Sequence, residues 1–449
     1  MSRIKDFFST IWHFLITLVE GFQALFWLLI KGTGVLSREG KAGLRGFLTA
    51  PSTQVMIFQF MRGFWPNLSL GRKLIKSYDN TGTAVVTRRA DVLDVLNRNE
   101  DFEVVYEPRM RKLTDGDNFF LGMQPGWDYT RDTSSMRLAG RMTDVPEIVL
   151  PRAQKVAAER VAASGGVIDL PQDLTLHVPW DMTATYFGVG GTEAEMQDWT
   201  TTLFWYLFGD LGADPDLDAK AMRNAAAMRA YLDGAVAKQK ASPDGATTIL
   251  SRCLALQAAG TPGMSDLGIR NNLLGILIGA IPTISKASCL ALDELLRRPE
   301  MLRRTQRAAI EGDDATMANC IWEALRFNPH NPVVYRRARR NTVVGKGTLR
   351  QTRIDKGQMV FAATLSAMFD RYEIPNPKSF RTDRLFSDYI IWGYGLHTCY
   401  GAAINEAVIP AVLKPLLQKK GLRRAEGDKG QIDTGGTPFP QHFHCVFDT

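Results

Sequence analysis

The sequence predicts a single, mainly α-helical domain with small β-sheets. Three observations support this class: helical periodicity runs through long stretches, strand-like stretches are short, and no linker-like segment divides the 449 residues. Hydrophobic residues make up 45% and charged residues 22% of the chain. This is the usage of a globular protein, so a disordered or fibrous protein is excluded.

The short elements follow in chain order. Helical patterns cover 91–99, 146–164, 192–209 and 219–240. Strand-like stretches cover Val85–Val86, 333–337, 342–346, 352–362 and 439–447. Because the long patterns are helical and the strands are small and scattered, helices should build most of the core.

The first 32 residues form an apolar amino-terminal segment. Residues 7–30 are long enough for a helix that crosses a bilayer, but Glu20 near the middle disfavours a simple span. A polar stripe follows at helical spacing: Ser9, His13, Thr17 and Glu20. We expect a helix that lies at a membrane interface. The alternatives are a helix docked on a partner, a true span and a signal peptide.

The longest helical pattern runs over 265–298, with Ser265 as its expected N-cap. It is apolar nearly all round, so it should be buried. Pro282 lies inside it and should kink or widen the helix, while Gly275 and Gly279 leave room for another group to approach the helix. Two interpretations stay open: a core helix with a harmless kink, and a helix deformed over a bound ligand.

The charge balance and the cysteines limit the partners. The 54 bases and 47 acids give a net charge of +7, and the bases form no stripe interleaved with aromatics, so we expect no nucleic-acid partner. The five cysteines include no pair with metal-site or redox spacing. Four of them should be buried structural thiols in a reducing compartment, and the sequence therefore predicts a cytoplasmic protein.

The fifth cysteine, Cys399, lies in the glycine-rich stretch 392–401, directly before a helical pattern that begins at Ala402. Glycines permit positive φ and close backbone approach. A cysteine at a helix N-terminus meets free N–H groups, which favour the thiolate. From the residues alone, a nucleophile, a metal ligand and a structural thiol all stay open.

The spacing Trp392-x-x-Gly395-x-His397-x-Cys399-x-Gly401 resembles the haem-binding loop of the cytochrome P450 superfamily. Upstream, Glu323-Ala-Leu-Arg326 resembles the Glu-x-x-Arg helix of the same family, and the long helix lies where the family's distal helix belongs. The resemblance covers residues 45–449. It implies the cytochrome P450 fold, a haem b (iron protoporphyrin IX) cofactor and oxidoreductase activity.

The resemblance also assigns residues. Cys399 would be the thiolate ligand of the haem iron. His397 and Arg336 would bind the propionates, and Tyr129 takes a third position where the family commonly has His. Glu323, Arg326 and Arg384 would hold the structure beneath the haem. Trp392, Gly395 and Gly401 complete the loop around the ligand.

The main departure from the family pattern lies in the long helix. Pro282 replaces the acid that the family uses to relay protons, while Thr283 keeps the alcohol of that relay. We expect a monooxygenase that takes electrons from NAD(P)H through a ferredoxin or flavoprotein reductase and hydroxylates a lipophilic small molecule. The alternatives are a peroxide-using enzyme, a hydroperoxide-rearranging enzyme and, in another class, a membrane-associated binding protein without activity.

Overall fold

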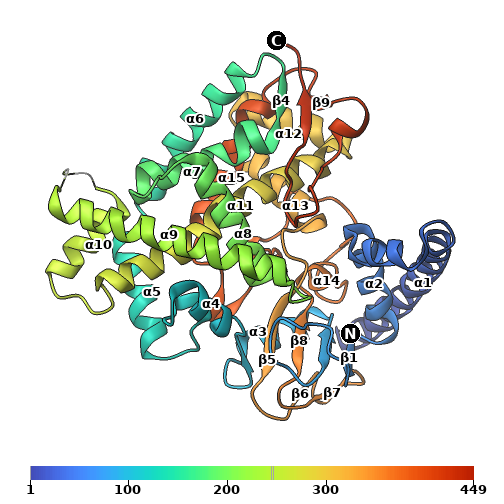
Figure 1. Ribbon diagram of the computed structural model, residues 1–449. Helices are drawn as coiled ribbons and strands as arrows, with labels where there is room; N and C mark the ends of the chain where they lie inside the picture. Colours follow the sequence, from blue (N-terminus) through green and yellow to red (C-terminus); the bar gives the residue numbers. More distant parts are fainter. Residues whose placement is uncertain (1, 244, 246) are drawn as a thin grey trace. The chain divides into compact units, whose positions relative to one another are not determined.

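A computed structural model describes residues 2–243, 245 and 247–449, without the side chains of 2–9, 45 and 49. Its chain forms two compact units (Figure 1). The first unit contains the residues up to Ile75, Asp79–Glu103 and Arg326–Thr398. The second unit contains Lys76–Tyr78, Val104–Leu325 and Cys399–Thr449. Since each unit collects distant segments, no single point in the sequence divides the chain.

The first unit is built on a five-stranded sheet in the order β1-β2-β8-β5-β3. Only the β2–β8 pair is parallel among the described strands of this sheet. A two-stranded sheet, β6-β7, adjoins it in the same unit. The strand bounds are β1 Asn67–Leu70, β2 Thr83–Val86, β3 Phe102–Glu103, β5 Val334–Ala338, β6 Thr342–Val344, β7 Thr352–Ile354 and β8 Met359–Ala362. The apolar residues of β2, β5 and β8 pack with those of α3 in one buried cluster.

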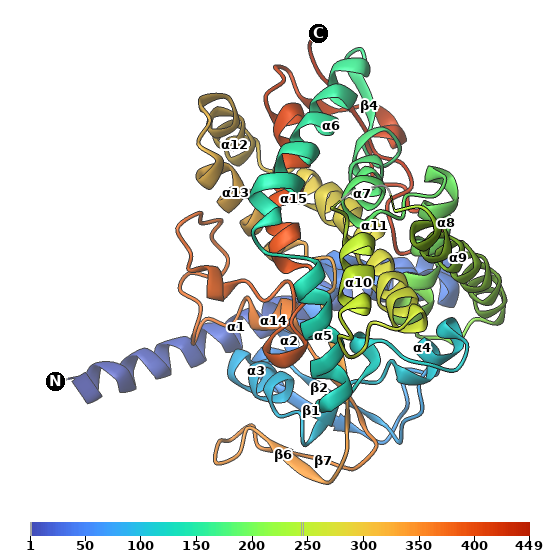
Figure 2. The ribbon, with the colours of Figure 1, turned by 90° about the vertical axis from the view of Figure 1, so that its left-hand side faces the viewer.

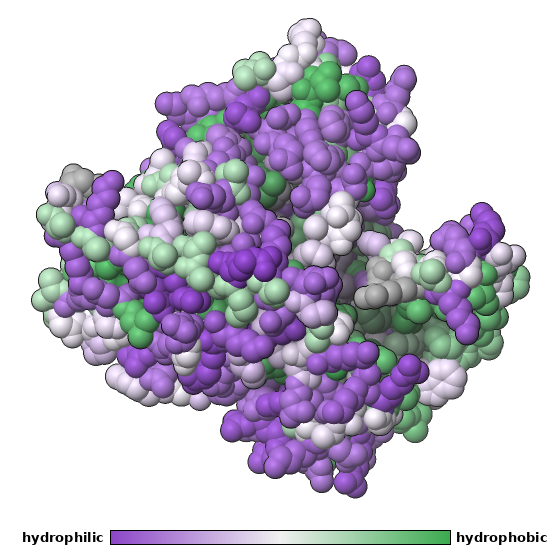
Figure 3. Space-filling model, in the orientation of Figure 1, coloured by the Kyte–Doolittle hydropathy of each residue, from purple (hydrophilic) through white to green (hydrophobic). Residues whose placement is uncertain are grey.

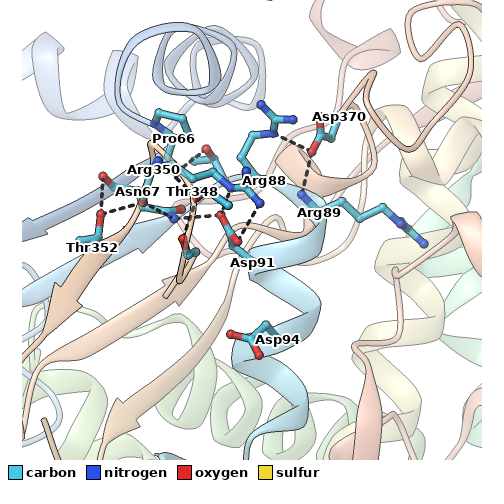
Figure 4. Close-up of polar contacts among 12 residues, drawn as sticks. Pro66, Asn67, Arg88, Arg89, Asp91, Asp94, Thr348, Arg350, Thr352 and Asp370 are labelled. Carbon is cyan, nitrogen blue, oxygen red and sulfur yellow. Dashed lines mark hydrogen bonds and ion pairs between the residues drawn. The ribbon is translucent and has the colours of Figure 1, made fainter. Parts of the chain in front are cut away.

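The helices of the first unit are α1 Ser2–Thr49, α2 Pro51–Phe64, α3 Arg89–Asn97 and α14 Thr364–Ala367, with short turns at Phe386–Asp388 and Gly395–His397. A polar network fixes the start of α3 (Figure 4). Asp91 accepts hydrogen bonds from Asn67 (2.9 Å) and Arg350 (2.5 Å). Asp370 accepts from the Arg88 side chain (2.8 Å) and from the Arg89 backbone N–H (2.9 Å). These charge-assisted bonds tie α3 to the segment after α14 and to the β6–β7 region.

The amino-terminal helix α1 packs on α2 in the first unit (Figure 2). The two helices approach closely at a pair of glycines: a Cβ added to Gly63 would lie 3.1 Å from the Gly21 Cα. The Gln59 side chain donates a hydrogen bond to the Glu20 carbonyl oxygen at 2.7 Å. Glycines at a crossing let two backbones approach, so the sequence itself sets where these helices meet. Gly40 interrupts α1 with φ of 63°.

The second unit is mainly helical. Its helices are α4 Glu107–Thr114, α5 Trp127–Ala139, α6 Leu150–Ala163, α7 His177–Met182, α8 Glu193–Phe204, α9 Pro215–Ala241, α10 Ile249–Ala258, α11 Asp266–Leu296, α12 Pro299–Glu311, α13 Asp314–Phe327 and α15 Ala402–Leu417. The last two residues of α13 belong to the first unit. π-helical turns cover Val145–Val149, Leu170–Thr175, Thr183–Phe187 and Trp205–Gly209. A three-stranded antiparallel sheet has the order β4-β10-β9, with β4 Val167–Asp169, β9 Arg423–Arg424 and β10 His444–Val446.

Helix α11 is the central element of the second unit. It packs against α7, α8, α9 and α15 (Figures 1 and 2). The side chain of Ser265 accepts a hydrogen bond from the Gly268 N–H at 3.1 Å, which confirms the predicted N-cap. The helix stays α-helical through Pro282. Its nearly continuous apolar surface is buried, as the sequence predicts.

Several predicted boundaries of helices and strands are wrong. The pattern over 352–362 contains two strands, because a turn at 355–358 separates β7 from β8. Of 439–447, only His444–Val446 form a strand. The helix predicted over 192–209 ends as α8 at Phe204 and continues as a π-helical turn. The helix-dominated class with small sheets is confirmed.

Candidate functional site

A pocket of about 900 Å³, its open mouth included, lies within the second unit. Its walls come from α5, α11, the π-helical turn Thr183–Phe187 and the start of α15. Apolar side chains predominate in the lining: Phe120, Leu121, Met136, Met142, Val145, Met182, Phe187, Ile249, Ile276, Ala280, Ile284, Ala403 and Ile404. A pocket lined by so few polar groups suits an apolar ligand.

Cys399 lies in the pocket wall, directly before α15. Its carbonyl oxygen accepts a hydrogen bond from the Ala402 N–H at 3.2 Å, and the Asn405 amide lies 3.9 Å from its sulfur. Burial raises the pKa of the Cys399 thiol, and this outweighs the lowering by the Gly401 N–H and by the charge of Arg137. The Gly401 N–H acts in the direction expected of the helix end, but burial has the larger effect. A coordinated metal would deprotonate the thiol outright.

Helix α11 forms another wall of the pocket and presents small residues to it, among them Gly275, Gly279 and Ala280. A Cβ added to Gly279 would meet no atom within 4 Å, so open space lies beside this residue. A Cβ added to Gly275 would lie 2.4 Å from the Phe119 ring. Gly279 borders the space for a ligand, whereas Gly275 makes room for a neighbouring side chain.

Pro282 and Thr283 follow on the same helix, but neither is among the described residues that line the pocket. The Thr283 hydroxyl donates to the carbonyl oxygens of Gly279 and, at 3.3 Å, of Ala280. Pro282 has no N–H to donate. The hydroxyl proton of Thr283 is thus engaged by the backbone of its own helix.

Arg137 is the α5 cation at the pocket. It lines the pocket, its guanidinium carbon lies 4.6 Å from the centre of the Tyr400 ring, and its charge lowers the pKa of both Cys399 and Tyr129. For Tyr129 itself, burial dominates and raises the pKa, and this residue is not in the described lining. Arg131 is paired with Asp128 (2.9 Å) and Asp132 (2.7 Å). Of these two α5 arginines near Tyr129, Arg137 is therefore the one that lines the pocket.

These residues fit a haem. The thiol of Cys399 would supply the soft ligand, the space beside Gly279 is open toward the pocket, and Arg137 would offer a cation to an acidic substituent. The buried Tyr400 hydroxyl has no hydrogen-bond partner among the described atoms, as expected for a polar group that meets a ligand. No cluster of three or more His, Cys, Asp or Glu side chains that could hold a metal ion occurs among the described residues.

Two predicted propionate residues lie together in the first unit. Arg336 is buried on β5, with 3% of its surface exposed, and its side chain donates to the Tyr335 carbonyl oxygen at 2.9 Å. Burial and the charge of Arg336 lower the pKa of His397 to about 4, so this imidazole is neutral at pH 7. Gly395 has φ of 75°, and a Cβ there would lie 3.0 Å from the Leu96 carbonyl oxygen, so the loop requires glycine. Trp392 packs against Phe386 at 5.6 Å.

The predicted structural triad also has a defined environment. Glu323 and Arg326 are fully buried on α13. In the first unit, Arg326 donates to the carbonyl oxygens of Met368 (3.0 Å) and Ser379 (3.4 Å). Arg384 donates to the same Ser379 oxygen at 2.9 Å. Both arginines thus bind the same carbonyl oxygen and hold the backbone at Ser379 in place.

Sequence reasoning missed Tyr400 and Asn405 as pocket residues. Tyr400 directly follows Cys399, and Asn405 lies six positions after Cys399 in the first turn of α15. The helical pattern that begins at Ala402 could have indicated Asn405, because this residue lies one helical turn after Gly401. The four other cysteines, Cys253, Cys289, Cys320 and Cys445, are free and buried, as predicted.

A helix-dominated fold with a cysteine and a long core helix lining one pocket is the arrangement that a haem-thiolate protein requires. A family model described as "Cytochrome P450" matches residues 77–419, and the chain belongs to this family. It is an oxidoreductase family whose members bind haem.

Solved cytochromes P450 share the fold. Cytochrome P450 CYP109Q5 from Chondromyces apiculatus superposes with a TM-score of 0.72 at 18% identity, over 90% of this chain and 98% of that one. P450BioI, solved with an acyl carrier protein ligated to hexadec-9Z-enoic acid, superposes with a TM-score of 0.75 at 15% identity, over 89% and 99%. At these identities the likeness concerns the fold.

Curated relatives match over shorter segments. The 7,8-linoleate diol synthase of Pyricularia oryzae is 39% identical over 83 residues, which are 18% of this chain and 7% of that protein. The putative cytochrome P450 135A1 of Mycobacterium tuberculosis is 25% identical over 206 residues, or 44% of each chain. The chain thus spans less than half the length of these relatives.

Proposed function

We propose that this protein is a haem-thiolate monooxygenase that hydroxylates a lipophilic small molecule. The observation that carries the proposal is Cys399 in the wall of an apolar pocket beside Gly279. In the reaction, one atom of dioxygen enters a C–H bond of the substrate, the other leaves as water, and NAD(P)H supplies the two electrons. A separate ferredoxin or flavoprotein reductase delivers them.

The haem, when bound, supplies dioxygen activation at a thiolate-ligated iron. The chain's own residues do the rest. Cys399 would hold the iron, Arg137 would hold an acidic substituent, and the apolar lining would orient the substrate and exclude water. The resemblance to the family gives Arg336 and His397 the same role as Arg137. The Thr283 hydroxyl donates its hydrogen bond to a backbone carbonyl oxygen, and Pro282 offers no acid, so proton delivery in this enzyme depends on another group or on water.

A rearrangement of a lipid hydroperoxide is the second candidate. Pro282 in place of an acid favours a reaction that needs no proton relay and no external electrons. Two relatives are named linoleate diol synthases, and a third, from Fusarium oxysporum, is named a bifunctional dioxygenase-epoxy alcohol synthase. These names support lipophilic acids as the first compounds to test with either reaction.

Three parallel incubations separate the mechanisms. The purified haem protein receives a lipophilic acid with NAD(P)H and a ferredoxin–reductase pair, the same acid with hydrogen peroxide, or the hydroperoxide of the acid alone. We expect hydroxylated product with label from isotopic dioxygen only in the first incubation. Product from hydroperoxide alone, without electrons, would contradict monooxygenase activity and support the second candidate.

No docking face for the redox partner is assigned. Of the basic residues near the carboxyl end, Lys414 pairs with Asp314 (2.7 Å) and Arg424 pairs with Asp293 (2.6 Å). Arg423 lies 4.0 Å from Asp448. Because acidic residues of the same chain partly neutralise these charges, we interpret the basic residues as the ordinary solvated end of a helix.

We further propose that α1 holds the protein at a membrane surface on the cytoplasmic side. The polar stripe of α1 faces the first unit: Glu20 pairs with Arg371 and with Lys378 (3.1 Å), and the His13 ring lies 5.6 Å from Tyr372. Thr17 is 7% exposed. The side chain of Ser9 lies outside the described residues. The helix is therefore attached to the protein by its polar side.

The apolar side of α1 is exposed as a result (Figure 3). Its large apolar side chains have exposed fractions from 39% to 67%: Ile11, Trp12, Phe14, Leu15, Val19, Phe22, Phe26, Leu29, Ile30, Leu36 and Leu48. By length and composition, Thr10–Leu44 and the buried core helix α11 are the two described helices that are able to cross a membrane. Because Glu20 is held by the first unit, a helix lying along the bilayer fits α1 better than a span.

A further inference from the structure

Helix α15 presents one side-chain amide to the pocket. Three of its residues line the pocket, Ala403, Ile404 and Asn405, and of these three only Asn405 has a polar side chain. The Asn405 backbone N–H donates to the Gly401 carbonyl oxygen at 2.9 Å, so the first turn is regularly helical. Helical side chains lean toward the helix N-terminus, and for Asn405 this is the direction of Cys399.

The Asn405 amide meets the sulfur of Cys399. Its nitrogen Nδ2 donates to Cys399 Sγ at 3.9 Å, and the side chain has no other hydrogen bond in the part of the chain that the structure describes. An N–H···S bond is longer than an N–H···O bond because sulfur is the larger atom. An amide in an apolar wall is costly to leave unpaired, so the sulfur is the acceptor that this wall provides.

Helix formation does not explain an asparagine at this position. Asparagine favours the N-cap of a helix, but the N-cap of α15 is Gly401, and Asn405 is the fourth residue of the helix. Inside a helix, asparagine is a weaker helix former than the alanines that precede it. The chain thus gives up helix stability where an amide meets the candidate ligand, and such local conflicts are expected at functional positions.

We propose that the Asn405 amide donates a hydrogen bond to the Cys399 sulfur in the haem protein and thereby raises the reduction potential of the iron. The inference rests on the proposed function, because it concerns the ligand of the same cofactor. A donor beside the sulfur stabilises its negative charge and leaves less electron density for the iron. The reduced state carries one more electron, so it gains more from this donor than the oxidised state does. Asn405 would be a positioning residue that acts through Cys399.

The test uses the full-length haem protein and two variants that lack the donor. Asn405→Leu keeps about the same side-chain size, and Asn405→Ala favours the helix and needs less room. The matched control is Gln418→Met, which removes an amide at the other end of α15, where Gln418 donates to the Ala309 carbonyl oxygen at 3.0 Å. A redox titration measures the potential, and resonance Raman spectroscopy measures the Fe–S stretching frequency.

Loss of the hydrogen bond should make reduction of the iron about 3–10-fold less favourable. This corresponds to a fall in potential of about 30–60 mV, at about 59 mV for each tenfold change. The Fe–S frequency should rise, because a sulfur without the donor binds the iron more strongly. Gln418→Met should leave both quantities unchanged.

An unchanged potential and Fe–S frequency in Asn405→Leu or Asn405→Ala would overturn the proposal, and so would equal changes in Gln418→Met. The wild type gives a further test that needs no variant. Transfer into D2O replaces the amide hydrogens of Asn405 and should shift the Fe–S frequency. The absence of any shift would also overturn the proposal.

Failure of the proposed function has a different signature. A preparation without a haem-thiolate spectrum contradicts the function itself. A normal spectrum with the same potential in the wild type and the Asn405 variants contradicts only the role of Asn405.

Discussion

At the residue scale, the candidate site residues have surroundings that the sequence does not reveal. The spacing of the loop motif was enough to select Cys399 and His397 as candidate site residues. Arg336 was selected by the resemblance of its segment to the family. The α5 cation at the pocket could not be named, because Arg131 and Arg137 both follow Tyr129 on one helix and only the structure shows that two aspartates pair with Arg131. The effect of burial on the pKa of Cys399 could not be predicted, because it depends on how the chain packs around the sulfur.

Arg137→Ala should weaken haem retention. If Arg137 binds an acidic substituent of the haem, its loss removes a charge-assisted contact, worth about 1.5–3 kcal/mol. Transfer of haem to an excess of apomyoglobin measures the dissociation rate, which should rise about 10–100-fold. Arg131→Ala is the control from the same helix and should leave the rate unchanged. Equal rates in both variants would show that Arg137 does not hold the haem.

Substitution of alanine for each of two glycines of α11 should change the free energy of unfolding in opposite directions. Gly279→Ala should raise the free energy of unfolding of the haem-free protein by up to about 1 kcal/mol, because alanine favours a helix and no atom lies within 4 Å. Gly275→Ala should lower it by about 1–3 kcal/mol, because its Cβ overlaps Phe119. Urea unfolding measures both. A loss of stability in Gly279→Ala would contradict the open space assigned to this position.

At the scale of elements, the close approach of α1 and α2 is the feature least visible in the sequence. The stripe of His13, Thr17 and Glu20 was recognisable at helical spacing, but a polar stripe ordinarily faces water. Its partners, Arg371, Lys378 and Tyr372, lie more than 300 positions away in the chain. The sequence therefore predicts an amphipathic helix and leaves open which side is attached.

Gly63→Leu should detach α1 from α2. A side chain at this position meets the Thr17 carbonyl oxygen at 3.0 Å and the Gly21 backbone, so the helices must separate. Limited proteolysis should then cut between α1 and α2 at least several-fold faster than in the wild type. Gly46→Leu provides the control, since an added Cβ there meets no atom within 4 Å. Equal cleavage of the two variants would contradict the crossing at Gly63.

The exposed face of α1 should bind lipid. Replacement of Trp12, Phe22 and Phe26 by Glu should abolish co-sedimentation with phosphatidylcholine–phosphatidylglycerol vesicles while the haem spectrum persists, because charged side chains oppose burial in the interface. The control replaces Trp127, Leu349 and Leu385, which are exposed apolar residues of other segments, by Glu. Undiminished vesicle binding by the α1 variant would refute the membrane role.

At the scale of the whole molecule, the fold class was predictable and the boundaries of the small sheets were not. Long helices such as α11 have a strong periodic signal that burial on all sides reinforces. Strands of two to five residues carry little signal, because pairing with distant partners defines them, as Val334 with Ala362 shows. The distribution of the chain over two units likewise follows from contacts between distant segments.

The account depends most on the role of Cys399 as the haem ligand. The most direct test is the absorbance spectrum of the reduced carbon-monoxide adduct, recorded for the wild type, Cys399→Ser and the control Cys445→Ser, which alters another buried free thiol. We expect the red-shifted thiolate band in the wild type and in Cys445→Ser, and its complete loss in Cys399→Ser. An unaltered band in Cys399→Ser would contradict the account.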